Sequence, residues 1–304
     1  RIASSSYDIW KNVISFNKDE IIYSLNDLKN HIENIIKDIE NEWKSFKYFI
    51  SPPTGIDMTT VNAIRSECES HNQAFGLVIG YPGFHAWEGK VTGSVQTLTY
   101  TFYDTPSILD EWFELELEAG TKGMELYLAL KPDYICFGGS GTLTLANTEL
   151  VMRYAIPALK KWSAMAKAAG VPSVLHSCGK SRRLVDMLVE HTDINCINPL
   201  ECPPMGDVDL AEVKRSHGND IALMGNLHTT NVMLTGSSDD VYRASVQAIE
   251  GAGENGGFIL STGDQCPRDT PDENIFAMLH AVQDKGWYDS PDKIDGPCMT
   301  PFTG

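Results

Sequence analysis

The sequence predicts an α/β fold in which parallel strands close into a (β/α)8 barrel. Short apolar runs alternate with helix-length segments along most of the 304 residues, which is typical of a parallel sheet whose strands are joined by helices. Polar side chains follow directly after most of these runs, and a closed barrel gathers the carboxyl ends of its strands at one mouth. An open doubly wound sheet would show the same alternation. The placement of the polar residues favours the barrel.

The N-terminal part, residues 1–73, is predicted to be mainly helical. Apolar residues recur at helical spacing from Ser24 to Trp43, which indicates a packing helix, and a second helix is expected over residues 57–72. Between them, residues 46–50 form a possible strand that ends before Pro52 and Pro53.

The barrel itself is expected over residues 74–288, with residues 289–304 as a tail of the same single domain. Six convincing strands are predicted at 74–79, 133–137, 171–178, 194–198, 220–224 and 256–261, and helices at 105–129 and 147–169. The glycine-rich segment 138–141 is interpreted as a turn. Because eight strands are needed and position 1 is not Met, the chain is expected to lack the N-terminal segment of its barrel.

The helix over residues 105–129 carries a row of acidic side chains, and such a row is usually a solvated face. This prediction covers Asp110, Glu111, Glu114, Glu116 and Glu118.

Charge and composition exclude several classes of function. The net charge of -17 argues against nucleic-acid and anionic-membrane partners, which bind through clustered Lys and Arg. No apolar run approaches the roughly 18 residues of a membrane helix. The seven cysteines are an odd number without a regular framework, which favours a reducing, cytoplasmic compartment with free thiols.

The most informative pair of residues is His176 and Cys178, at the end of a predicted strand. Residues two apart on a strand point to the same face, so these side chains can act together. Zinc prefers nitrogen and sulfur donors and uses three or four of them. Cys266 is the leading third ligand, and the other candidates that follow strands are Glu201, Cys202, His228 and Asp264. Cys68, Cys136 and Cys196 are interpreted as small core residues.

With these residues assembled, the chain resembles the uroporphyrinogen decarboxylase superfamily, and more closely its zinc-dependent methyltransferase branch, which works with corrinoid proteins. The resemblance covers roughly Phe75 to Trp287. Its most specific segments are 174–179, 209–214 with 221–226, and 257–263 followed by Asp269-Thr-Pro271. The resemblance implies a (β/α)8 barrel.

The resemblance also implies a metal site in which a downstream cysteine joins His176 and Cys178 on zinc. The branch usually has Gly-Cys shortly before Thr-Pro, but this chain has Asp264 in that register and Cys266 two residues later. Cys266 is favoured as the third ligand, with Asp264 as the alternative, and Glu201 is expected as the fourth ligand.

The main functional hypothesis is therefore a cytoplasmic zinc methyltransferase that moves a methyl group between a small thiol or methylated substrate and the cobalt of a corrinoid protein. Glu201, Asn226 and His228 are the candidate catalytic residues. The residues expected to bind substrate at the mouth are Tyr81, His85, Trp87 and Gly139. One alternative is a metal-independent decarboxylase, although the arginine-rich motif of such enzymes does not occur here. Another is a non-catalytic corrinoid-handling module with a structural zinc.

Overall fold

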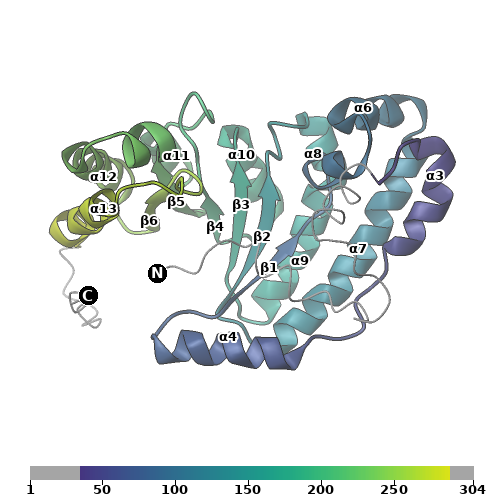
Figure 1. Cartoon of the computed structure of the whole chain (residues 1–304), viewed down its shortest axis with the longest axis horizontal. Coiled ribbons are helices and arrows are strands. Elements are labelled where there is room, and N and C mark those ends of the chain that lie inside the picture. The colour runs from purple at the N-terminus through teal and green to yellow at the C-terminus, as the bar shows by residue number, and fades with distance from the viewer. Residues whose placement is uncertain (1–34, 288–304) are drawn as a thin grey trace.

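The structure, a computed structural model, describes residues 35–287 and is built around one parallel sheet (Figure 1). Its strands are β1 (Gly76–Gly80), β2 (Tyr134–Ser140), β3 (Ser173–Cys178), β4 (Cys196–Asn198), β5 (Ala222–Leu227) and β6 (Phe258–Thr262). They lie side by side in chain order, and every neighbouring pair is parallel. Consecutive parallel order is the strand order of a (β/α) barrel, so the predicted fold class is confirmed, as are all six predicted strands.

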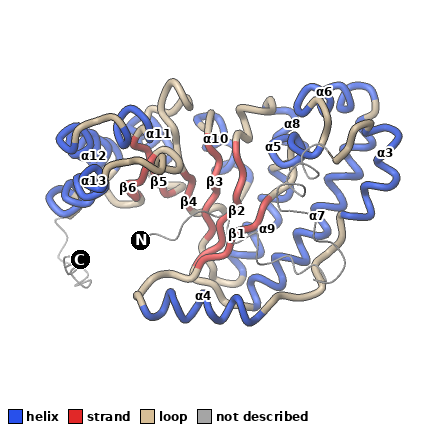
Figure 2. Tube along the Cα trace, in the orientation of Figure 1, coloured by secondary structure: helices blue, strands red, loops and turns tan. Residues whose placement is uncertain are grey.

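Helices connect the strands and pack beside one another along the sheet (Figure 2). They are α7 (Pro106–Ala129), α8 (Thr148–Tyr154), α9 (Ile156–Ala168), α10 (Arg182–His191), α11 (Leu210–His217), α12 (Ser238–Ala252) and α13 (Asp272–Lys285). Before and after β1 come α3 (Ile39–Phe46), α4 (Met58–Ser70), α5 (Phe84–Trp87) and α6 (Ser94–Asp104), of which α5 and α6 were not predicted. No helix in residues 35–287 is long and apolar enough to cross a membrane.

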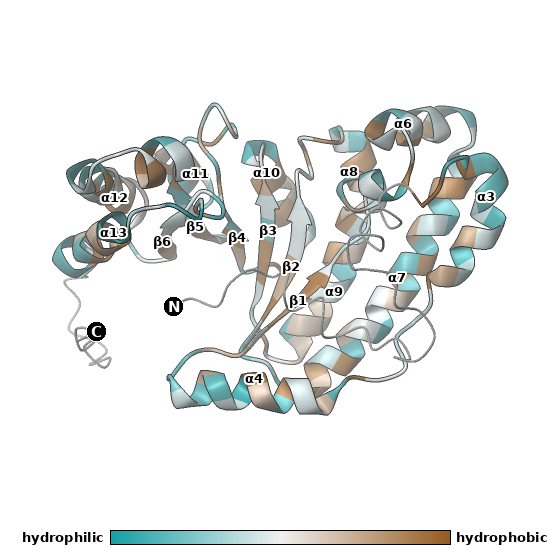
Figure 3. Ribbon diagram, viewed as in Figure 1, coloured by the Kyte–Doolittle hydropathy of each residue, from teal (hydrophilic) through white to brown (hydrophobic). Residues whose placement is uncertain are grey.

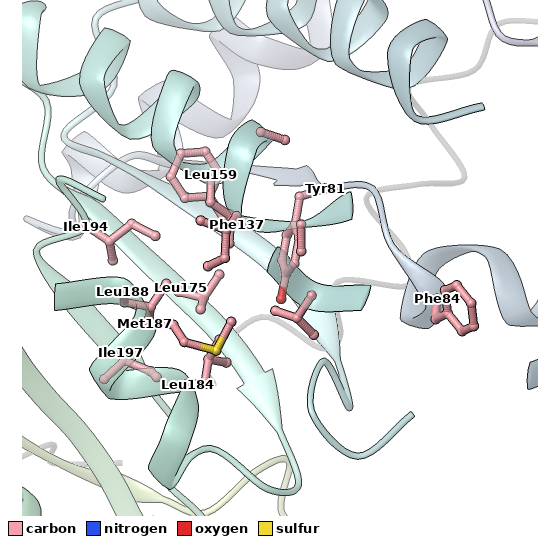
Figure 4. Close-up of a cluster of buried hydrophobic side chains, with 14 of the residues drawn as sticks. Tyr81, Phe84, Phe137, Leu159, Leu175, Leu184, Met187, Leu188, Ile194 and Ile197 are labelled. Atoms are coloured by element: carbon pink, nitrogen blue, oxygen red, sulfur yellow. The ribbon is translucent and has the colours of Figure 1, made fainter. Parts of the chain in front are cut away.

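The hydrophobic core lies between the sheet and these helices. In Figure 4, Phe137 of β2 and Leu175 of β3 lie among Leu159 of α9 and Leu184 of α10. Apolar colouring likewise follows the strands, whereas the outer turns of helices such as α4 and α12 are hydrophilic (Figure 3). Because side chains alternate along a strand, the neighbours of Leu175 point away from the helices. His176 lies on this opposite face of the sheet.

Two N-terminal predictions differ from the structure. The predicted strand at 46–50 is instead the end of α3 followed by a 3-10 turn at Lys47–Phe49. Phe46 stays helical because it packs on Trp43 and Trp112, with ring centroids 6.0 and 5.4 Å away. Of the predicted helix at 24–43, residues 24–34 lie outside the described residues.

Proline and glycine account for two further differences. The predicted helix at 147–169 is divided at Ala155, because Pro157 in the first turn of α9 has no N–H to continue the preceding helix. The segment predicted as a turn at 138–141 continues β2 as far as Ser140, and the chain turns only at Gly141, where φ is 73°.

The acidic row on α7 is largely exposed, as predicted, and the exception is Glu116, whose side chain is 18% exposed. The Glu116 carboxylate accepts hydrogen bonds from the indole N–H groups of Trp87 (2.8 Å) and Trp112 (2.9 Å) and from Lys90 (3.1 Å). Asp110 pairs with Arg153 and Glu111 with Lys47. The Glu116 carboxylate thus pairs with two buried indole groups of the N-terminal part.

Candidate functional site

The candidate site begins at the carboxyl ends of β2 and β3. His176 and Cys178 occupy alternate positions of β3 and are half-buried, whereas the intervening Ser177 is fully buried. Ser140 lies opposite Cys178 in the register of the two strands, and its hydroxyl oxygen is 2.7 Å from the Cys178 sulfur. The predicted common face of His176 and Cys178 is therefore present.

The His176 ring is held between two neighbours. Its Nδ1 lies 2.7 Å from Oδ1 of Asn198, the residue beside it on β4. Its Nε2 lies 3.9 Å from Oδ1 of Asp264, which follows β6. Burial lowers the pKa of His176, but hydrogen bonds with Cys178 and Asn198 and the charge of Asp264 outweigh it, so the pKa is raised overall.

Glu201 lies directly beside this pair. It is buried, with 6% of its surface exposed, and its carboxylate accepts a hydrogen bond of 2.5 Å from the backbone N–H of Gly179. The preceding Leu200 has a left-handed backbone with φ of 59°, which is costly for a bulky residue. The Asn226 amide supports this turn by donating to the Leu200 carbonyl at 2.9 Å. Asn226 therefore helps to position Glu201.

His228 has a fixed orientation at the end of β5. Its Nδ1 accepts hydrogen bonds from the backbone N–H groups of Thr230 (3.2 Å) and Asn231 (3.0 Å), so in the neutral ring the proton is on Nε2. That Nε2 is buried and has no hydrogen-bond partner among the described residues. A cavity of about 10 Å³, the size of one water molecule, is lined by His228, Asn226 and Glu201, among others.

The two other candidate thiols, Cys202 and Cys266, are half-buried, as Cys178 is. Cys266 packs against the hydrophobic core beside the hydroxyl groups of Thr262 and Thr270, and burial raises its pKa. Burial also raises the pKa of Cys202. Within residues 35–287, no three His, Cys, Asp or Glu side chains are close enough together to hold a metal ion. The structure thus places Asp264 3.9 Å from His176, whereas Cys266 packs against the hydrophobic core.

The residues predicted to bind substrate occupy more interior positions than the sequence indicated. Tyr81 is 2% exposed, and its hydroxyl lies 2.6 Å from that of Thr142. Gly139 faces the Tyr81 ring so closely that a Cβ atom there would collide with the hydroxyl. Trp87 is fully buried and binds Glu116. Tyr81 and Trp87 are thus packed in the interior, and the missing side chain of Gly139 leaves room for the Tyr81 ring.

The sequence analysis missed two residues of the site, Ser140 and Asn198. Both are polar residues at the last position of a strand, and both face β3 in the sheet register. The pairing of residues between neighbouring strands could not be assigned from the sequence. A polar residue at the end of a predicted strand, however, would have indicated both positions.

His85 is half-buried, with its ring centroid 4.4 Å from that of Tyr81 and its Nε2 buried without a partner among the described residues. Burial lowers its pKa to about 4. A neutral buried histidine stabilises the protein above its unfolded pKa of about 6.5, and this contribution is lost as the pH falls from about 6.5 to about 4.

As the pH falls from 7.5 to 4.5, the wild type should lose roughly 2 kcal/mol of unfolding free energy through protonation of His85. His85→Phe cannot be protonated there and should lose that much less. Urea unfolding at the two pH values measures this difference. His71→Gln, at a histidine whose side chain is 58% exposed, is the control and should show almost no change. If the unfolding free energies of His85→Phe and the wild type fall equally between the two pH values, burial does not lower the pKa of His85.

The fold and this site together define an α/β barrel-type protein with a polar centre at the carboxyl ends of its strands. The model of the uroporphyrinogen decarboxylase (URO-D) family matches residues 88–285, and the chain belongs to this family.

Relatives with assigned activities fall into two groups. A methylated-thiol–coenzyme M methyltransferase of Methanosarcina mazei is 24% identical over 48% of this chain and 36% of its own length. A uroporphyrinogen decarboxylase of Anaeromyxobacter dehalogenans is 25% identical over 75% of this chain and 63% of its own. The chain thus spans between about a third and two thirds of these proteins.

Among solved structures, a methyltransferase from Methanosarcina mazei has a similar fold. It superposes with a TM-score of 0.55 at 18% identity, over 68% of this chain and 58% of that one. Such a likeness supports the fold.

Proposed function

We propose that this protein is a cytoplasmic, zinc-dependent methyltransferase that moves a methyl group between a small thiol or methylated substrate and the cobalt of a corrinoid protein. The observation that carries the proposal is the His176–Cys178 pair, with the Asp264 carboxylate 3.9 Å from His176. Nitrogen, sulfur and oxygen donors in one place suit zinc. The methyltransferase relative agrees with this reading.

The residues present fit zinc in their donor types and in the orientation of the histidine. His176 and Cys178 would be the first two ligands, Asp264 or Cys266 the third, and Glu201 the fourth. Of these residues, Asp264 already has its Oδ1 3.9 Å from the Nε2 of His176. Bound zinc would lower the pKa of a thiol acceptor or polarise the oxygen of a methyl ether.

The protein's own groups would prepare this chemistry. The Gly179 N–H holds the Glu201 carboxylate beside Cys178, and Asn226 keeps the turn at Leu200 in place. The side chains of His176 and Asp264 are 31% and 36% exposed, so the site is open to a substrate. A catalytic zinc has three protein ligands and an open position, whereas a structural zinc is enclosed by four. A substrate would therefore have to displace one of the four ligands proposed here, and a zinc that keeps all four would favour a corrinoid-handling module with a structural zinc.

The proposal is tested by metal analysis followed by a methyl-transfer assay with methylcobalamin and a panel of thiols, and with methyl ethers and reduced cobalamin in the other direction. We expect about one zinc per chain and its loss in Cys178→Ala, which removes a thiolate ligand. Methyl transfer should fall at least about 100-fold in the same variant, because zinc supplies the activation. Purified protein with less than about half an equivalent of zinc, unchanged in Cys178→Ala, would contradict the proposal.

A decarboxylase is the second candidate, because the decarboxylase relatives match 75% of this chain. Such an enzyme would bind the carboxylates of its substrate through cationic side chains. Among the described residues, the side chains that contact His176, Cys178 and Glu201 include no arginine. Release of carbon dioxide from uroporphyrinogen, insensitive to chelators, would favour this alternative.

A further inference from the structure

Asn198 makes two contacts that together fix the state of His176. Its Oδ1 lies 2.7 Å from Nδ1 of His176, and its Nδ2 donates to the backbone carbonyl of Met224 on β5 at 3.4 Å. The side chain thus spans from β4 to both neighbouring strands. Its place in the sheet is set by register, because His176 and Asn198 are direct partners on β3 and β4.

The Met224 carbonyl decides which way the Asn198 amide is turned. Rotating the amide by half a turn would place its oxygen against the carbonyl oxygen of Met224, and two acceptors repel each other. The same rotation would place the amide nitrogen of Asn198, in place of Oδ1, opposite Nδ1 of His176. The orientation with Oδ1 toward His176 therefore satisfies both neighbours.

This orientation assigns the proton of the neutral imidazole. Since Oδ1 can only accept, Nδ1 of His176 must carry the hydrogen, and the lone pair is then on Nε2. Nε2 is the nitrogen that faces Asp264 and is 3.9 Å from its carboxylate. A lone pair on this nitrogen is what a metal ion requires, and a partner on the other ring nitrogen is the usual support of a metal-binding histidine.

We propose that Asn198 is a positioning residue that holds His176 in the Nδ1–H tautomer, with the Nε2 lone pair directed into the metal site. This inference rests on the proposed function for its purpose, but the tautomer itself is a property of the metal-free protein. Asn198 acts only through His176, and the Met224 carbonyl in turn orients Asn198.

The tautomer is measured by nitrogen NMR of the metal-free protein with 15N-labelled histidine at pH 8.5, and His176→Gln assigns the signal. We expect His176 in the wild type to show a protonated Nδ1 and an unprotonated Nε2. In Asn198→Ala the two tautomers should mix, and the affinity for zinc should fall about 10- to 100-fold, the usual cost of losing such a partner. Asn198→Asp should keep the tautomer, because its carboxylate also accepts from Nδ1, although it loses the hydrogen bond to the Met224 carbonyl and should lower stability.

Asn195→Ala is the matched control. Asn195 also joins β4 to β3, through a 2.9 Å hydrogen bond from the Ser173 N–H, but at the other end of the strands from His176. It should affect stability without moving the His176 signal. An Nε2–H tautomer in the wild type, or an unchanged tautomer in Asn198→Ala, would overturn the inference even if zinc binds. If the wild type binds no zinc while the tautomer responds as expected, the inference stands and the proposed function fails.

Discussion

Replacing Glu116 with leucine is expected to lower the free energy of unfolding by about 3–5 kcal/mol. Leucine fills a similar volume but leaves the indole N–H groups of Trp87 and Trp112 unpaired, and both rings are fully buried. Each buried donor without a partner costs about 1–3 kcal/mol, and the ion pair with Lys90 is lost as well. Chemical unfolding followed by circular dichroism measures the change.

Two variants make this experiment specific. Glu116→Gln keeps one acceptor oxygen and should cost less than the leucine variant. Glu118→Leu places the same substitution at an exposed position two residues along α7, where the expected change is within about 0.5 kcal/mol. Equal losses of unfolding free energy in Glu116→Leu and Glu118→Leu would show that the hydrogen bonds to the two indole groups do not contribute.

Asp264→Asn is expected to weaken zinc binding about 100-fold or more, since even loss of an outer partner typically costs 10- to 100-fold. Asp264 is the carboxylate that the structure brings to His176, whereas Cys266 packs against the core beside Thr262 and Thr270. With Asp264 as the third ligand, Cys266→Ser should change the affinity by less than about threefold, because the thiol would not bind the metal.

Competition with a chromophoric chelator measures both zinc affinities in the same buffer. The reverse pattern, with a large loss in Cys266→Ser and a small one in Asp264→Asn, would show that the segment after β6 shifts to bring the thiol onto the metal. Either result would decide a choice that the sequence left open.

The strands were predictable because each is a short apolar run that ends in polar residues, as at His176 and Cys178. The helix ends and the first connections were less predictable. Phe46 is apolar and close to a proline pair, which is compatible with a strand, and only its packing on Trp112 makes it helical. Local patterns do not contain such contacts between distant segments.

The same limit applies to the site. The pair of His176 and Cys178 is local, since two residues on one strand share a face, and it was found. Trp87 and Tyr81 were predicted to bind substrate, and the structure shows that both are buried, which depends on packing with distant segments that the sequence does not reveal. Asn198 is recognised as the partner of His176 only because the two residues are paired on neighbouring strands, and the sequence does not show this pairing.

The close approach of Gly139 to Tyr81 has a consequence for how this protein can vary during evolution. Any side chain at position 139 would need the space that the tyrosine hydroxyl occupies, and that hydroxyl also binds Thr142. A change at position 139 is therefore accessible only after position 81 has become smaller, and the smaller residue would leave Thr142 without this partner. We therefore expect a side chain at position 139 to be tolerated only together with a smaller residue at position 81.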